Sequence, residues 1–324
     1  MRNMLAGHSK RLYAAIALPL IVAALLYAAP VRTPAAQGDI QQLVKTFDYD
    51  SKMPLNAEIK IDKERSDLTK YHLTFDSVDG ERIPALLYIP AKKQGPLPCV
   101  IFQHGYGMDK SFADFATGFF IKKGYAIIAI DFEYHGERKE AGKDIFSTDA
   151  QSDFKALRQS IIDLRRVVDY LESDSRIDTA KIGYIGFSMG SLLGVSFVGV
   201  DSRVKTAVFV VGGGDWKTII DKSTLEIFEN IRNYTKEHGQ TTADFAAVLD
   251  PVDPIHYVGL IAPRPILFIN GAQDVIVPNE ATNELFAAAK EPKEIKWYPE
   301  SGHVVDPGKV AKDSLKWFKE YLEK

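Results

Sequence analysis

Short uninterrupted apolar runs alternate with longer helical stretches through most of this chain. This alternation constrains the fold more than any other feature of the sequence. The apolar runs occupy residues 99–103, 125–130, 181–186, 205–211 and 265–269, and a more polar strand-like run at 294–298 ends the series. Strands that are apolar on both faces are typical of a parallel sheet with helices on each side. The sequence therefore predicts an α/β fold with a doubly wound, mostly parallel sheet.

The helices of this fold are expected between the apolar runs. The clearest is 153–172, where Leu157, Ile161 and Leu164 belong to an apolar stripe at helical spacing. Shorter helical patterns occupy residues 111–123, 189–200, 279–290 and 308–322. Ahead of the parallel strands, two strand-like runs at 71–78 and 82–89 flank an Asp-Gly pair. This arrangement predicts an antiparallel hairpin.

Two segments depart from this alternation. Residues 37–70 are polar and show no clear period, so they are interpreted as a linker and an N-terminal extension of a domain spanning 71–324. Residues 215–256 are rich in polar helix formers and are predicted to form a small helical cap inserted between two strands. Its aromatic residues either line a substrate pocket beneath the cap or form the core of the cap itself; they are Trp216, Phe228 and Tyr234.

The first 36 residues have a composition of their own. They contain four basic residues and no acidic one, which leaves 36 basic against 43 acidic residues for the body. Residues 12–29 are uncharged, and a helix of that length, at about 1.5 Å per residue, nearly spans the hydrocarbon core of a bilayer. Basic residues ahead of this stretch predict that the N-terminus lies inside and the body outside. Residues 1–36 are thus expected to form an apolar anchor helix or a signal peptide, with a periplasmic or secreted body.

The flanking residues bear on cleavage of this segment. A cut after Ala29 would leave Tyr27 at the third position before the cut, and a cut after Ala36 would leave Pro34 there. Signal peptidases prefer small residues at that position. The sequence therefore favours an uncleaved membrane anchor over a cleaved signal peptide.

Several classes of partner and cofactor are not expected. The acidic body carries no basic cluster with interleaved aromatic residues, so nucleic acid is not an expected partner. The single cysteine, Cys99, cannot form an intrachain disulfide or a thiolate zinc cluster. Glu133 and His135 lack a third ligand at a metal-site spacing. Neither a metal nor another cofactor is therefore expected, and the oligomeric state is left open.

A serine between glycines follows the run at 181–186. The sequence Gly186-Phe-Ser188-Met-Gly190 stands between a predicted strand and a predicted helix rich in small residues. The glycines permit a sharp turn that strains the backbone of Ser188 and exposes its hydroxyl above the sheet edge. N–H groups at the start of the following helix can stabilise an oxyanion. The pattern predicts a nucleophilic serine.

A serine nucleophile needs a base, and the base needs an acid to orient it. His303 lies in the loop after the last predicted strand, and Asp274 follows the run at 265–269. Asp215 is an alternative acid, whereas Asp306 is interpreted as a helix cap. The predicted triad is therefore Ser188, Asp274 and His303.

An oxyanion also needs backbone N–H donors. The residue after the nucleophile, Met189, is one predicted donor, and Tyr106 in the glycine-rich loop at 103–107 is the other. His104 in the same loop is interpreted as bracing it through a hydrogen bond, rather than as a catalytic residue.

Motifs carry a family resemblance across residues 71–324. They are His104-Gly-Tyr-Gly107, Asp131-Phe-Glu-Tyr-His-Gly-Glu-Arg138, Gly186-Phe-Ser-Met-Gly190, Ala262-Pro-Arg-Pro265, Gly271-Ala-Gln-Asp274 and Gly302-His303. Together they resemble the α/β-hydrolase superfamily, and within it the dienelactone-hydrolase, acetyl-xylan-esterase and prolyl-oligopeptidase-like group of serine hydrolases. Two departures stand out. Dienelactone hydrolases use a cysteine nucleophile where this chain has Ser188, and residues 37–70 are too few to supply the propeller of the oligopeptidases.

The resemblance and the residues together predict an esterase that acts on a small-molecule ester through an acyl-enzyme on Ser188. A small serine exopeptidase is the alternative, although no acidic pair that could bind a peptide amino terminus is evident. An inactive, membrane-tethered binding protein is a third hypothesis, which the complete set of triad and oxyanion residues argues against. Candidate substrate contacts are Glu133, His135 and Trp216; the first two are alternatively part of a salt-bridged supporting loop.

Overall fold

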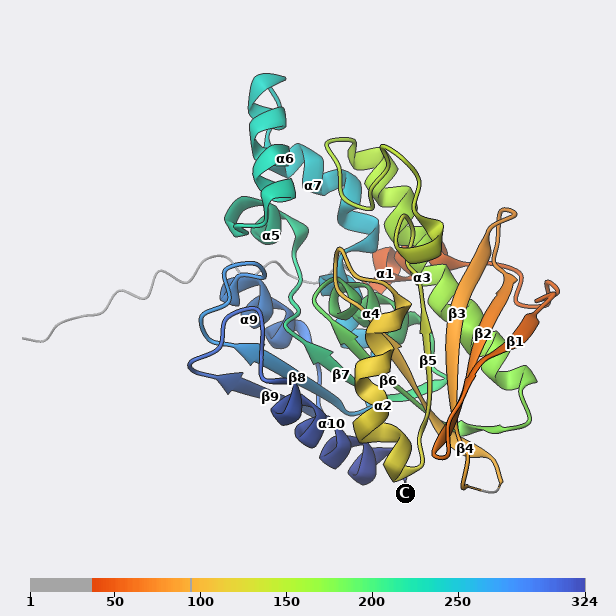
Figure 1. The fold of residues 1–324 in the computed structure, drawn as a ribbon. Helices are drawn as coiled ribbons and strands as arrows, with labels where there is room; N and C mark the ends of the chain where they lie inside the picture. The colour runs from red at the N-terminus through yellow and green to blue at the C-terminus, as the bar shows by residue number, and fades with distance from the viewer. Residues whose placement is uncertain (1–36, 94, 324) are drawn as a thin grey trace, which may run out of the picture. The chain divides into compact units, whose positions relative to one another are not determined.

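The computed structural model describes residues 37–93 and 95–323, so the expected apolar helix at 12–29 lies outside the described residues. The described chain contains a nine-stranded sheet with the order β1-β2-β3-β5-β4-β6-β7-β8-β9. In Figure 1 the sheet runs from β9 on the left to β1 on the right. Within the described ranges, no helix has both the length and the apolar character needed to cross a membrane.

Six strands in the sheet are parallel to one another. They are β4 (Leu97–Gln103), β5 (Ala126–Ile130), β6 (Ile177–Phe187), β7 (Val204–Val210), β8 (Ile266–Gly271) and β9 (Lys293–Tyr298). Each overlaps one of the strand-like runs in the sequence. The mostly parallel sheet is therefore confirmed.

The remaining strands are antiparallel and form one side of the sheet. They are β1 (Glu58–Glu64), β2 (Leu68–Asp76) and β3 (Arg82–Pro90). β2 and β3 form the predicted hairpin, and the turn between them places Asp79 and Gly80 at positive φ. Glycine adopts this conformation readily, and aspartate tolerates it better than most residues.

The structure differs from the expectation for residues 37–70. A helix, α1, spans Gln37–Val44, and β1 pairs with β2 along the edge of the sheet. Every residue of β1 is exposed, and most of them are charged, as is common for edge strands. Because this strand buries neither face, hydrophobic periodicity gave no signal for it.

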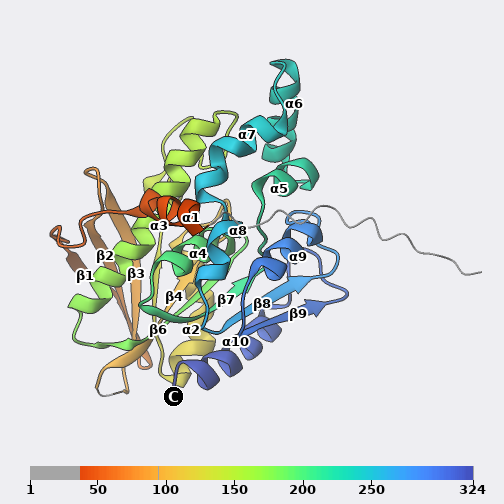
Figure 2. The same cartoon turned by 180° about the vertical axis from the view of Figure 1, so that it is seen from behind.

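Helices cover both faces of the sheet, which confirms the doubly wound arrangement (Figures 1 and 2). On one face lie α2 (Asp114–Phe120) and α10 (Pro307–Tyr321). On the other lie α3 (Ala150–Ser173), α4 (Met189–Val200), α8 (Pro254–Tyr257) and α9 (Asn279–Ala288). Short 3-10 helices occupy Lys45–Phe47, Lys110–Ala113, Ile121–Lys123, Gly136–Arg138, Asp250–Val252 and Val258–Leu260.

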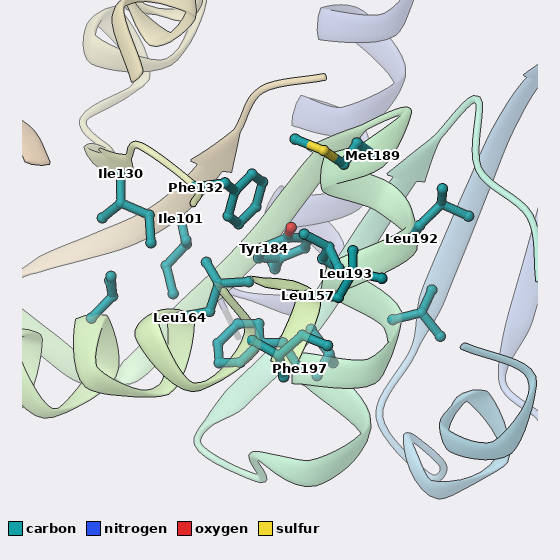
Figure 3. Close-up of a cluster of buried hydrophobic side chains, with 14 of the residues drawn as sticks. Ile101, Ile130, Phe132, Leu157, Leu164, Tyr184, Met189, Leu192, Leu193 and Phe197 are labelled. Atoms are coloured by element: carbon teal, nitrogen blue, oxygen red, sulfur yellow. The ribbon is translucent and has the colours of Figure 1, made fainter. Parts of the chain in front are cut away.

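The core beneath α3 and α4 is filled with large side chains. Figure 3 shows Leu157 and Leu164 of α3 close to Leu193 and Phe197 of α4. Tyr184 of β6 lies in the same cluster, and its ring meets Phe197 edge-on at a centroid distance of 5.6 Å. These contacts hold α3 and α4 against the sheet at the strand that precedes the predicted nucleophile.

A helical insertion separates β7 from β8, where the sequence predicted one. It consists of α5 (Trp216–Lys222), α6 (Glu226–Glu237) and α7 (Thr242–Leu249), followed by α8. Trp216 and Phe228 are buried, and both rings contact Phe146. Trp216 and Phe228 therefore form the core of the insertion rather than the wall of a substrate pocket beneath it.

Candidate active site

The turn between β6 and α4 holds Ser188 in a strained backbone conformation, with φ +52° and ψ −117°. Such a conformation costs about 1–3 kcal/mol for a residue other than glycine. The glycines on either side of Ser188 allow neighbouring backbone segments to approach the turn closely. A Cβ on Gly186 would lie 2.3 Å from the Gly190 oxygen, and a Cβ on Gly190 would lie 2.6 Å from the His104 oxygen. The N–H of Ser188 also donates to Val210 of β7. The predicted strand-to-helix turn is thus present and is held by its neighbours.

His303 lies between Ser188 and Asp274. Its Nε2 is 2.8 Å from Ser188 Oγ, and its Nδ1 is 2.8 Å from Asp274 Oδ2. The other carboxylate oxygen, Asp274 Oδ1, accepts the N–H groups of Ile276 and Val277, which fixes the carboxylate. Because a carboxylate only accepts hydrogen bonds, Nδ1 carries the proton and Nε2 accepts from the serine hydroxyl. The three predicted triad residues are therefore brought together in hydrogen-bonding order.

The two other carboxylates considered for the site lie at helix starts. Asp215, the alternative acid, accepts the N–H and the hydroxyl of Thr218 at the start of α5. Asp306 accepts the N–H of Lys309 and caps α10, as predicted. The acid that contacts His303 is Asp274.

A buried histidine braces the loop after β4. His104 Nδ1 donates to the Gly105 oxygen at 2.8 Å, and its Nε2 accepts from the N–H of Phe132. Burial lowers the pKa of His104 to about 4, so the ring is neutral and can both donate and accept. In a planar trans peptide the C=O and N–H bonds point in opposite directions. Because the Gly105 oxygen points toward His104, the N–H of Tyr106 points away from it. His104 thus braces the loop, as the sequence predicted.

The two predicted oxyanion donors belong to segments that lie next to the nucleophile. Met189 is the first residue of α4, and a Cβ on Gly105, next to Tyr106, would lie 3.3 Å from Ser188 Cβ. Among the described residues, no backbone acceptor pairs with the N–H of Met189 or of Tyr106. Both amides are thus available to a ligand beside Ser188.

The three predicted substrate contacts are buried away from the cavity beside Ser188. Glu133 forms an ion pair with Arg138. His135 donates to the Glu133 oxygen and accepts the N–H of Gly107, and burial lowers its pKa. Trp216 belongs to the core of the insertion. Glu133 and His135 thus belong to a supporting loop, which was the alternative interpretation of the sequence. None of the three residues lines the cavity, so the structure does not support them as substrate contacts.

Asp131 is a structural anchor that the sequence analysis did not single out. Its carboxylate accepts the N–H and the ammonium group of Lys110, together with the N–H of Glu137. A Cβ on Gly136 would lie 2.2 Å from this carboxylate, so the glycine makes room for it. Asp131 ties the loop after β5 to the loop after β4. Across the described ranges, no three His, Cys, Asp or Glu side chains are grouped so that they could hold a metal ion.

An apolar cavity of about 330 Å³ opens beside Ser188 and His303. Its wall comes from the ends of β4, β6 and β7, from α2, and from the start of α10, and includes no residue of 215–256. Six phenylalanines line it: Phe102, Phe112, Phe115, Phe119, Phe120 and Phe187. The sequence did not predict this cavity, because its pattern placed the pocket beneath the insertion. The phenylalanine-rich segment at 111–123 was the available signal.

The chain matches the family model described as acetyl xylan esterase (AXE1) over residues 44–321. It is 26% identical over 259 residues to the putative hydrolase YtaP of Bacillus subtilis, covering 74% of this chain and 81% of that protein. Among solved structures, it resembles acetyl xylan esterase 1 from Thermoanaerobacterium with a TM-score of 0.76 and 19% identity, covering 89% of this chain and 95% of the other. It also resembles an acylaminoacyl peptidase from Pyrococcus horikoshii with a TM-score of 0.63 and 17% identity, covering 80% of this chain and 43% of the other.

The structural likenesses cover 89% and 80% of this chain, and they show the α/β-hydrolase fold. The family match spans the strand-to-helix turn at Ser188, the loop that carries Tyr106, and the loops of Asp274 and His303. Its members are hydrolases of the serine-esterase type. The chain belongs to the acetyl xylan esterase (AXE1) family.

Proposed function

We propose that this chain is a carboxylic-ester hydrolase that works through an acyl-enzyme on Ser188. The observation that carries the proposal is the pair of 2.8 Å contacts of His303 with Ser188 Oγ and with Asp274 Oδ2. Both are within the distance that proton transfer and orientation of the base require. The strained turn that presents the serine supports the same role.

The geometry supports a two-step reaction. His303 Nε2 takes the proton of Ser188 as its Oγ attacks the ester carbonyl, while Asp274 stabilises the imidazolium that forms. The N–H groups of Met189 and Tyr106 hold the oxyanion. His303 then protonates the departing alcohol, and the acyl group stays on Ser188. His303 then takes a proton from a water molecule, whose oxygen attacks the acyl carbonyl. As the bond from the acyl carbon to Ser188 Oγ breaks, His303 gives that proton to Oγ and the carboxylic acid leaves.

A serine exopeptidase is the second candidate, because the Pyrococcus peptidase shares the fold. An exopeptidase that binds a free amino terminus needs carboxylates close to the nucleophile. The cavity beside Ser188 has no Asp or Glu in its wall. That absence argues against a peptidase that binds a free amino terminus, and the match to the acetyl xylan esterase family favours ester hydrolysis, which is the activity that we propose.

The test combines covalent labelling with turnover. A fluorescent phosphonate is expected to label the wild-type chain and not Ser188→Ala, and the same substitution should lower ester turnover at least about 10⁴-fold. Ser196→Ala is the matched control, since Ser196 is buried in the same helix α4. An aminoacyl anilide, offered in parallel with short esters, separates peptidase from esterase. Unchanged labelling of Ser188→Ala would refute the proposed nucleophile.

We also propose that the body lies outside the cytoplasm and is tethered by the apolar stretch at 12–29. The support is the acid-free, basic composition of the first 36 residues. A fusion of residues 1–36 to alkaline phosphatase, which is active only outside the cytoplasm, should be active and sediment with membranes. An inactive fusion would contradict the proposed orientation, and an active but soluble fusion would indicate cleavage.

A further inference from the structure

We infer that the cavity between α2 and α10 binds the acyl chain of the substrate. The preferred substrates are then esters with a linear, apolar acyl chain of about six to ten carbons rather than acetate esters. This inference rests on the proposed function, because it assigns the cavity to the group that becomes attached to Ser188.

The cavity is continuous with the reacting atoms. Phe187 and Ser188 are consecutive in the chain, and both contribute to its wall, as do His303 and the two valines that follow it. A chain attached to Ser188 Oγ therefore enters this space directly.

The cavity runs from an exposed rim to the buried core. At the rim, Met108, Phe115 and Val304 are 45%, 51% and 81% exposed, high values for large apolar side chains. At the floor, Phe102 and Ile185 belong to the buried cluster between the sheet and α10. An extended chain can thus lie with one end at Ser188 and its length against apolar side chains.

The size of the cavity exceeds what an acetyl group fills. Its volume is about 330 Å³, whereas an apolar cavity of about 150 Å³ holds a benzene ring. A two-carbon acyl group would leave most of this space unfilled. A chain of about six to ten carbons matches it, with part of the length at the open rim.

The chemistry of the wall excludes charged or sugar-like groups. No Asp, Glu, Lys or Arg lines the cavity, and its polar side chains are those of Tyr106, Ser188 and His303. The Tyr106 hydroxyl is already engaged, since it donates to Asp144 at 2.8 Å. Hydroxyl groups placed in this space would lose their hydrogen bonds to water without replacement, so a hydrocarbon chain is the matching ligand.

The acyl chain, and not the alcohol, is assigned to the cavity. The alcohol must leave after the first step, and a water molecule must take its place beside His303. A space walled by strand ends and two helices suits the group that stays covalently attached through both steps. The alcohol is then expected on the open side of His303.

The first experiment measures kcat/KM of the full chain for p-nitrophenyl acetate, butyrate, hexanoate, octanoate and decanoate, each below its micelle-forming concentration. The inference predicts a rise of about two- to fourfold per added CH₂ group up to the length that fills the cavity. Ethyl octanoate and octyl acetate then separate the two sides of the ester. Ethyl octanoate is expected to be the better substrate, and a preference for octyl acetate would overturn the acyl assignment.

Two substitutions fill the cavity from opposite walls, so that a folding defect in one does not decide the outcome. Ala116→Leu lies on α2 and Ala311→Leu on α10, and both alanines line the cavity. Each is expected to lower the octanoate-to-acetate ratio of kcat/KM about tenfold or more. The matched control is Ala246→Leu, a buried alanine of α7 outside the wall, which should leave the ratio unchanged.

Failure of the inference is distinguishable from failure of the proposed function. Phosphonate labelling of Ser188 together with a preference for acetate would overturn the acyl pocket and leave the serine hydrolase intact. Equal octanoate-to-acetate ratios in wild type and in both cavity variants would also overturn it. Absence of both labelling and turnover of every ester would refute the proposed function itself.

Discussion

The two faces of the central sheet differ in how their apolar side chains pack. Beneath α3 and α4 lies a cluster of large buried side chains, among them Leu157, Tyr184 and Phe197 (Figure 3). Between α2 and α10 an equally apolar layer leaves a cavity of about 330 Å³ that opens at Ser188. Native interiors contain few voids of this size. The filled face therefore supplies stability, and the hollow face is available for a ligand.

Strand β6 contributes side chains to the cores on both faces of the sheet. In β6, Tyr184 points into the filled core, the next residue, Ile185, points into the hollow one, and Ser188 follows at the turn. The Tyr184 hydroxyl donates to the Gly190 oxygen at 2.5 Å, so the filled core also fixes the turn. Substitutions in the filled face should then mainly change the free energy of unfolding, and substitutions at the hollow face should mainly change activity or acyl-chain preference.

The largest effect is expected for Asp274→Asn, which changes the partner of His303 in the cavity wall. The amide would favour the wrong tautomer of His303, and kcat should fall about 10⁴-fold while the unfolding midpoint changes little. Asp306→Asn, at a nearby helix cap, is the control and should keep nearly full activity. A loss below tenfold for Asp274→Asn would contradict the orienting role of this carboxylate.

A smaller effect, on stability, is expected for Leu157→Ala in the filled face. Deleting this fully buried side chain should lower the free energy of unfolding by about 2–5 kcal/mol, measured by urea denaturation, and leave the acyl-chain preference unchanged. Phe119→Ala, in the cavity wall, removes a partly exposed ring and should cost less while altering that preference. Equal losses of stability in the two variants would contradict the distinction between the faces.

The smallest effect is a pH dependence at His104, which joins the two faces. Its ring packs on Phe132 of the filled core, and the adjacent Gly105 lines the cavity. Burial lowers its pKa from 6.5 to about 4. Between these values the unfolded chain binds a proton there and the folded chain does not, so its linkage lowers stability as the pH falls through this window.

His104→Gln removes that linkage. The wild type should lose about 2 kcal/mol more stability than the variant between pH 7.5 and pH 4.5, measured by urea denaturation at both values. Burial raises the pKa of Asp153 to about 7, which acts in the opposite direction. Because Asp153 is present in both proteins, its effect cancels in the comparison. Identical pH profiles would show that His104 is not held neutral by burial.

The parts of the fold that the sequence predicted are those with a local signal. Most of the parallel strands carry continuous apolar runs. The turn at Ser188 carries two glycines, at positions where a Cβ would clash with neighbouring backbone. By contrast, β1 depends on backbone pairing with β2 and buries neither face. Its position could not be predicted from hydrophobic periodicity.

The cavity could not be predicted for a different reason. It exists because side chains from three strands, α2 and α10 fail to fill the space between them. The phenylalanines at 111–123 signal an apolar wall, but no local pattern in the sequence signals the void behind it. For Trp216 the prediction of a substrate contact was wrong. This aromatic residue belongs instead to the core of the insertion. The three triad residues were predicted from the sequence, whereas the substrate contacts and the shape of the cavity were not.

The most direct test of the two-face comparison is a crystal structure of the protein inactivated with p-nitrophenyl octylphosphonate. A bond forms between Ser188 Oγ and phosphorus as p-nitrophenolate leaves, and the octyl chain then reports the acyl position. The chain is predicted to lie between α2 and α10, against Phe119 and Ala311. An octyl chain that extends instead toward α5–α7, or phosphorus attached to another residue, would contradict the account.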